Sequence, residues 1–381
     1  MNIPLFKPSI GEEELQALKK TFESGWIGLG PNTYEFERRF AEYIGVDHAL
    51  GLNSATAALH LALAVHGIEG GEVISPSLTF VSTNHAIMYN GGIPVFTDVD
   101  PDTLCLDPDA IKKNITDGTK AIITVHYGGQ PSEMDEINEI ARDHGIVVIE
   151  DAAHATGASY HGRKVGTLGD IACFSFQALK SLTTGEGGMV TTNDPEIHER
   201  MKLLRWMGID KDTFSRVGNK EYSWNYEVRD LGFKCHMNDI PATIGMVQLK
   251  RLDGYLNHER RRVAERYNER LGKLDWVKVP VDRKDSDRVY CIYAIQVEKD
   301  RDALMSFMKE RGIGTGVHYL PNHHHPYYRD LINEGRIPKP EVPVTEDLWK
   351  RIISLPLFAE LSNDEVDYVC ATIEAFGEQK G

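Results

Sequence analysis

Segments with helical and strand-like hydrophobic periodicity alternate along the first half of the chain. Apolar positions recur at helical spacing in some segments, and short apolar runs typical of buried strands separate them. The predicted helices are 15–24, 34–44, 57–66, 81–89 and 134–144, and the predicted strands are 49–52, 73–75, 93–98, 121–125, 146–150, 171–176 and 189–192. This alternation predicts an α/β fold in which helices wrap a mostly parallel sheet, with ligands outside the carboxyl ends of its strands.

The pattern changes after Asn238. A long, charged helical segment runs to about Leu274, and a strand-like run at 290–297 and helical runs at 303–311 and 364–376 follow it. We therefore expect a large domain over residues 1–250 and a smaller C-terminal α/β domain over residues 251–381.

Composition narrows the class of protein. The chain has 381 residues, of which 41% are hydrophobic, so it can bury a large core. Its 57 acidic and 42 basic residues give a net charge of -15, which disfavours nonspecific binding to nucleic acid or anionic membranes. The five cysteines form no CxxC pair, and neither a signal peptide nor an 18-residue apolar run is visible. We expect a cytoplasmic protein with no nucleic-acid or membrane partner.

Lys180 stands between an apolar strand-like run and a glycine-rich turn, in the segment DIACFSFQALKSLTTGEGGM. This position places its amine on a short connection at a strand end. A partly desolvated amine there would lose its proton more readily, and the neutral form bonds to aldehydes. An ordinary surface lysine is the alternative interpretation of this residue alone.

Two further motifs fall at predicted strand ends. Asp151 and His154 follow the apolar run IVVIE, where a carboxylate either contacts a ligand or caps a helix. Ser54, Ala55 and Thr56 follow the strand at 49–52 and open a helix, whose free amides and dipole would hold a phosphate. Helix capping by Ser54 or Thr56 is compatible with that role.

Together these motifs meet the needs of a pyridoxal phosphate enzyme. The cofactor requires a lysine for its aldehyde, a carboxylate for its ring nitrogen and a cup for its phosphate. Lys180, Asp151 and the turn at 54–56 could supply these three groups at one edge of the sheet.

The sequence also resembles the DegT/StrS nucleotide-sugar aminotransferases of the fold type I pyridoxal phosphate superfamily, over essentially its whole length. The resemblance is carried by ESGWIGLGP (23–31), LNSATAALHLAL (52–63), SPSLTFVST (75–83), VFTDVDPDTL (95–104), VHYGG (125–129), IEDAAHATGASYHGRKVG (149–166), SFQALKSLTTGEGGM (175–189) and MNDIPATIGMVQL (237–249). GIGTGVHY (312–319) and the spacing of His323 from Tyr327 and Tyr328 are closest to the branch that makes UDP-4-amino-4-deoxy-arabinose.

The resemblance implies roles for individual residues. Lys180 would bond to the cofactor, Asp151 would pair with its ring nitrogen, His154 would lie beside its hydroxyl and Phe80 would stack on its ring. Ala55, Thr56 and Ser175, together with Ser54 in the same turn, would hold the phosphate, and Asn238 would reach in from the partner subunit of a homodimer with shared active sites. The candidate substrate contacts are Trp26, His318, Tyr319 and His323.

The implied reaction is transfer of an amino group from L-glutamate to a nucleotide-linked keto sugar, such as a UDP- or dTDP-4-keto sugar, in amino-sugar and surface polysaccharide biosynthesis. Lys180 would carry the proton between the donor and the cofactor. A 3-keto nucleotide sugar, or an amino acid handled by another fold type I enzyme, is the alternative substrate. A noncatalytic binder of the cofactor would have no reason to keep Lys180 and Asp151 together.

Two apparent metal motifs have simpler interpretations. DVDPDT, at 98–103, resembles a calcium loop, but Thr103 stands where glycine is required, so a turn is expected. His323, His324 and His325 with His318 suggest zinc, but no carboxylate or cysteine lies at ligand spacing in the sequence. We therefore expect no metal.

Overall fold

The computed structural model describes residues 1–218, 225–298 and 300–379. Its largest sheet has seven strands in the order β1-β9-β8-β5-β4-β2-β3. The strands are β1 (His48–Leu52), β2 (Glu72–Pro76), β3 (Ile93–Thr97), β4 (Thr119–Val125), β5 (Val147–Asp151), β8 (Ile171–Ser175) and β9 (Gly188–Thr192). Only β9 runs against the others, because it pairs antiparallel with both β1 and β8. The predicted mostly parallel sheet is confirmed.

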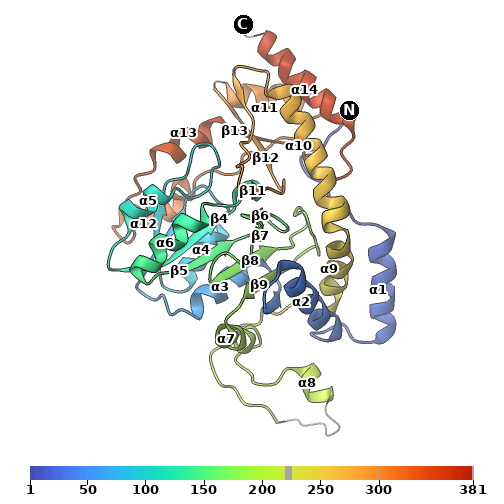
Figure 1. Ribbon diagram of the computed structural model, residues 1–381, viewed down its shortest axis with the longest axis vertical. Helices are drawn as coiled ribbons and strands as arrows, with labels where there is room; N and C mark the ends of the chain where they lie inside the picture. Colours follow the sequence, from blue (N-terminus) through green and yellow to red (C-terminus); the bar gives the residue numbers. More distant parts are fainter. Residues whose placement is uncertain (219–224, 299, 380–381) are drawn as a thin grey trace.

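Both faces of this sheet are buried, because side chains alternate between two hydrophobic cores. Ile122 and Val148 belong to one core, and their neighbours Ile123 and Ile149 belong to the other. The helices in this part of the chain are α1 (Glu12–Ser24), α2 (Pro31–Ile44), α3 (Ala55–Ala64), α4 (Ser82–Tyr89), α5 (Pro108–Asn114), α6 (Met134–His144), α7 (Pro195–Arg205) and α8 (Thr213–Gly218), and α8 lies on an arm away from the sheet (Figure 1). Figure 1 shows α3 and α6 beside this sheet.

A third core lies at the end of the molecule where the N-terminus and α14 meet (Figure 1). It is built on an antiparallel sheet with the order β10-β12-β13. Ile3 packs in this core and bridges to Ile313, so the start of the chain belongs to the C-terminal unit. The elements of this part are β10 (Val277–Lys278), β12 (Tyr293–Val297), β13 (Ile352–Leu355), α11 (Arg301–Glu310) and α14 (Asn363–Glu378).

The long helical segment that links the two parts is α9 (Asp239–Arg251), a π-helical stretch η2 (Leu252–Asn257) and α10 (His258–Leu271). Leu252 and Leu256 pack in a core of the large sheet, whereas Val263 packs in the C-terminal core. The change of core therefore falls within this helical segment, and a domain boundary at residue 250 stays a prediction.

Shorter elements complete the described chain. They are η1 (Tyr127–Gly129), η3 (Asn322–His324), α12 (Pro326–Asn333) and α13 (Pro343–Arg351), and a small sheet of β6 (Ser159–Tyr160), β7 (Arg163–Lys164) and β11 (Ser286–Asp287). Among the described residues, no helix is long and apolar enough to cross a membrane.

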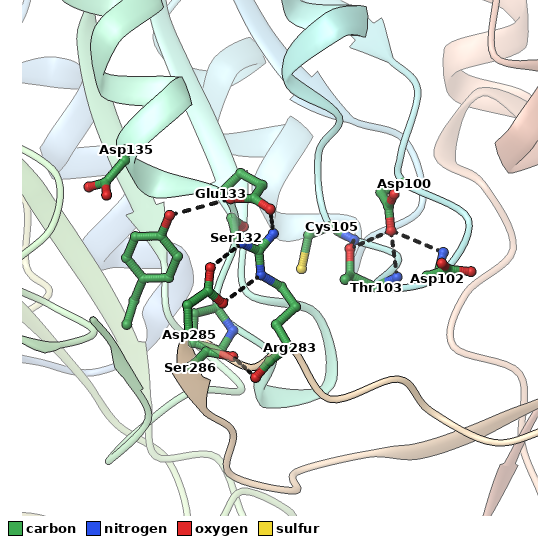
Figure 2. A network of polar contacts seen from close by, with 12 residues as sticks. Asp100, Asp102, Thr103, Cys105, Ser132, Glu133, Asp135, Arg283, Asp285 and Ser286 are labelled. Atoms are coloured by element: carbon green, nitrogen blue, oxygen red, sulfur yellow. Dashed lines mark hydrogen bonds and ion pairs between the residues drawn. The ribbon is translucent and has the colours of Figure 1, made fainter. Parts of the chain in front are cut away.

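Polar contacts tie the C-terminal half of the chain to the large sheet. Figure 2 shows the Arg283 guanidinium between the carboxylates of Glu133 and Asp285, and Arg283 Nη2 donates to Asp285 Oδ2 at 2.7 Å.

Near them, Asp100 Oδ1 accepts hydrogen bonds from the amides of Asp102 and Thr103 (Figure 2). The DVDPDT segment is thus a turn, as expected.

Candidate active site

A cavity of about 470 Å³ lies at the carboxyl ends of β1, β2, β5 and β8. Since these strands are parallel to one another, their carboxyl ends share one edge of the sheet. Ten of the residues singled out in the sequence line this cavity: Ser54, Ala55, Thr56, Phe80, Asp151, His154, Ser175, Lys180, His318 and Tyr319.

Asp151 is the last residue of β5, and its carboxylate is buried at the floor of the site. Burial raises its pKa, although hydrogen bonds from Thr83 and the Ala153 amide and the charge of Lys180 act in the opposite direction. Thr83 Oγ1 donates to Asp151 Oδ2 at 2.8 Å, and the Ala153 amide donates to Oδ1 at 3.2 Å. Because burial makes the ionised carboxylate costly, a positively charged group bound beside Asp151 would be stabilising.

His154 is buried beside Asp151 and held in its neutral form. Burial is the main cause that lowers its pKa well below the usual value, and the nearby Lys180 and His318 add to it. Its Nε2 lies 3.1 Å from the Tyr319 hydroxyl, while its buried Nδ1 has no hydrogen-bond partner among the described residues. An unmatched polar atom of this kind can serve a bound ligand.

Lys180 lies half-buried in the connection between β8 and β9, where its backbone amide closes a turn to the Gln177 carbonyl at 2.9 Å. Its charge acts on Asp151, His154 and His318, so its amine faces the same space as these groups. Phe80, 57% exposed, stands at the mouth of the cavity with its ring 6.1 Å from that of Tyr319.

The N-terminus of α3 forms one wall. Ser54 caps the helix by accepting from the Ala57 amide at 3.1 Å, which leaves the Ala55 and Thr56 amides at the helix start for a ligand. Thr56 Oγ1 lies 2.7 Å from Ser82 Oγ. Gly188, at the start of β9, packs against the backbone of this turn. A Cβ on Gly188 would lie 2.6 Å from the Ala55 nitrogen, so only glycine lets β9 approach so closely.

Several cavity residues were not predicted from the sequence. Thr83 and Ser82 come from the first turn of α4, and Phe6, Cys291 and Ile292 come from segments that pack against the sheet edge only in the folded chain. The apolar pattern of α4 shows which face is buried, but not that a hydroxyl meets Asp151.

Three predicted residues do not line the cavity. Trp26 donates from its indole to the Leu29 carbonyl at 3.1 Å and packs on Phe214. Asn238 caps α9 by accepting from the Ile240 amide at 3.0 Å. His323 contacts Ser77 and Glu346 instead.

A lysine and a buried carboxylate that face one cavity beside a helix start, at the carboxyl edge of a mostly parallel sheet, define a fold type I pyridoxal phosphate enzyme. The chain belongs to the DegT/DnrJ/EryC1/StrS aminotransferase family, whose model matches residues 8–374. It is thus a pyridoxal phosphate-dependent aminotransferase.

Individual relatives cover nearly all of the chain. The spore coat polysaccharide biosynthesis protein SpsC of Bacillus subtilis is 39% identical over 378 residues, which are 97% of this chain and 96% of SpsC. The PLP-form of the sugar aminotransferase Spr1654 from Streptococcus pneumoniae is 30% identical, with a TM-score of 0.90, over 100% of this chain and 99% of that one. PseC of Helicobacter pylori, an aminotransferase in pseudoaminic acid biosynthesis, is 29% identical, with a TM-score of 0.91, over 100% of both chains.

Proposed function

We propose that this aminotransferase moves the amino group of L-glutamate onto the keto group of a nucleotide-linked sugar. The main support for this proposal is that Lys180, Asp151 and the start of α3 line the same cavity. SpsC, Spr1654 and PseC, with their roles in polysaccharide, sugar and pseudoaminic acid chemistry, support a sugar as the acceptor.

The residues at the cavity fit pyridoxal phosphate. When bound, the cofactor supplies an aldehyde that takes up amines and a ring that spreads negative charge. The free amides of α3 and the hydroxyls of Ser54, Thr56 and Ser175 suit its phosphate. The unmatched Nδ1 of His154 suits its hydroxyl, and the exposed face of Phe80 suits its flat ring.

We assign proton transfer to Lys180 and the protonation of the cofactor ring to Asp151. The Lys180 Nζ would take a proton from the α-carbon of the amino donor and later deliver one to the sugar carbon, while the bound cofactor would stabilise the negative charge that each transfer leaves. The buried Asp151 carboxylate would hold a proton on the ring nitrogen, because an ionised carboxylate in a buried position favours a cationic partner beside it. Neutral His154 keeps a second positive charge out of this space.

We assign the sugar to the region of His318 and Tyr319, which line the same cavity as Asp151. Its acceptor would be a UDP- or dTDP-linked 4-keto sugar. Burial and the charge of Lys180 lower the pKa of His318 to about 4, so its ring is neutral at physiological pH and can serve as a hydrogen-bonding group for a sugar hydroxyl.

We propose a homodimer with shared active sites as the assembly. Asn238 stands at the start of α9, outside the cavity of its own chain, and would contribute to the phosphate site of the partner. If so, mixing inactive Lys180→Ala and impaired Asn238→Ala subunits would restore activity to mixed dimers, since one of their two sites is intact. No gain on mixing would contradict a shared site.

The substrate is tested by incubating the holoenzyme with L-glutamate and a panel of UDP-, dTDP- and GDP-linked 3-keto and 4-keto sugars. We expect 2-oxoglutarate and an aminated nucleotide sugar to form in equal amounts, measured by mass spectrometry. Turnover of free 2-oxo acids, with no sugar on the panel aminated, would overturn the sugar assignment.

A further inference from the structure

Two adjacent histidines and a glutamate converge outside the cofactor cavity. His323 and His324 come from η3, and Glu346 comes from the first turn of α13. One ligand atom from each lies within 4.8 Å of the others. None of the three lines the cofactor cavity, so they form a separate cluster.

Both imidazoles approach the same carboxylate oxygen. His323 Nε2 lies 2.8 Å from Glu346 Oε1, and His324 Nε2 lies 2.9 Å from that oxygen. Both contacts are short enough for polar interactions with the carboxylate, and they bring two imidazole nitrogens to one oxygen. Such a convergence of two nitrogens and one carboxylate oxygen is suited to share a cation.

His323 and Glu346 each have a further hydrogen-bond partner that orients the side chain, as metal ligands usually do. The Ser77 hydroxyl lies 3.1 Å from His323 Nδ1, so with a metal bound it can accept the Nδ1 proton while Nε2 exchanges its hydrogen bond to Glu346 for the metal. The Trp349 indole donates to Glu346 Oε2 at 3.1 Å, which leaves Oε1 toward the histidines.

The backbone around the cluster is also fixed. Asp98 caps α13 by accepting from the Val344 and Thr345 amides, each at 2.8 Å, and so holds the helix that carries Glu346. The Asn322 amide donates to the Ser77 carbonyl at 2.8 Å, which holds η3 against the loop after β2. Because the backbone already holds the three side chains in place, less conformational entropy is lost when they bind an ion.

We propose that His323, His324 and Glu346 bind a zinc ion through His323 Nε2, His324 Nε2 and Glu346 Oε1. Two imidazole nitrogens and one carboxylate oxygen are a donor set that Zn²⁺ prefers, and a fourth position is left for water. The side chain of His323 is 8% exposed, whereas those of His324 and Glu346 are 34% and 37% exposed, so water can reach the open side. The ion would join η3 and α13 and, through Ser77, support the loop that leads to Phe80.

The test uses the full-length holoenzyme without an affinity tag, stripped of metal and dialysed against Zn²⁺. We expect one Zn²⁺ per chain and, in a crystal, an anomalous zinc signal between the three side chains. His324→Gln and Glu346→Gln are each expected to weaken Zn²⁺ binding by at least about tenfold, since even outer partners of metal ligands change affinity on that scale. His325→Gln, which alters a neighbouring histidine outside the cluster, is the matched control and should bind as the wild type does.

Failure of the wild-type protein to retain Zn²⁺ would overturn the proposal. So would zinc retention that is equal in the wild type, His324→Gln and Glu346→Gln, because the ion would then be bound elsewhere. Circular dichroism of each variant shows that it is folded, so that lost binding is not mistaken for lost structure.

Discussion

The surroundings of Asp151 show how single residues set the chemistry of the site. Burial raises the pKa of this carboxylate, and the Thr83 hydroxyl and Ala153 amide oppose that rise. Thr83 does not need to touch the substrate to act, because its hydrogen bond stabilises the ionised form of Asp151.

Thr83→Val should therefore lower kcat/KM by about tenfold, since a hydrogen bond to a charged group contributes on the order of 1.5 kcal/mol. Loss of this donor raises the pKa of Asp151 further, so the acidic limb of the pH–activity profile should move to higher pH. Thr83→Ser keeps the hydroxyl and should restore both values. A Thr83→Val profile that coincides with that of the wild type would contradict this role.

Lys180 and Asp151 could be predicted from the sequence because each follows an apolar run at a strand end, and parallel strands bring such ends together. Glu346 could not. It lies 23 residues beyond His323, in a helix that the sequence pattern did not predict. No carboxylate lies at ligand spacing from the histidines along the sequence, but the fold brings Glu346 beside them, and the zinc-binding experiment tests the expectation that no metal binds.

At the scale of elements, β9 passes close to the start of α3, where we place the cofactor phosphate. A Cβ on Gly188 would lie 2.4 Å from the Ser54 carbonyl carbon, so a larger residue must displace the turn that presents the Ala55 and Thr56 amides.

Gly188→Ala is expected to weaken retention of the cofactor during dialysis and to reduce the free energy of unfolding by about 1–3 kcal/mol, the usual cost of overpacking. Gly254→Ala is the matched control, because nothing lies within 4 Å of a Cβ there. Equal cofactor retention by the two variants would show that the α3 turn tolerates displacement or does not hold the phosphate.

The strands of the large sheet were predicted within a residue or two at most of their ends, because strands buried on both faces are continuous apolar runs. The helices α5, α7, α12 and α13 were not predicted. All four begin with proline and are 7 to 11 residues long, so each offers few turns in which a helical hydrophobic pattern can be recognised. The π-helical stretch η2, which interrupts the long helix at the change of core, also has no signal in the hydrophobic pattern.

For the whole molecule, the buried His154 and the half-buried His198 and His236, which burial keeps neutral, set a dependence of stability on pH. Burial is the main cause that lowers the pKa of His198 and of His236 to about 4, and His154 is lowered well below its usual value. Unfolded histidine titrates near pH 6.5, so the unfolded chain binds more protons between that pH and about 4. The stabilisation is thus complete above about pH 6.5 and is lost as the pH falls toward 4.

The midpoint of urea unfolding of the apoprotein should therefore fall over this pH range. His236→Gln cannot titrate and should lose less stability on acidification than the wild type, although it can be less stable at neutral pH. His258→Gln changes an exposed histidine and should follow the wild type. Parallel curves for wild type and His236→Gln would contradict the assignment to His236.

The proposed function depends on Lys180 as the covalent attachment point of pyridoxal phosphate. The most direct measurement is borohydride reduction of the cofactor-loaded enzyme, followed by proteolysis and peptide mass spectrometry. We expect the phosphopyridoxyl group on Lys180 and no labelled peptide from Lys180→Ala. A label on another lysine, or an unlabelled wild-type protein, would contradict the account.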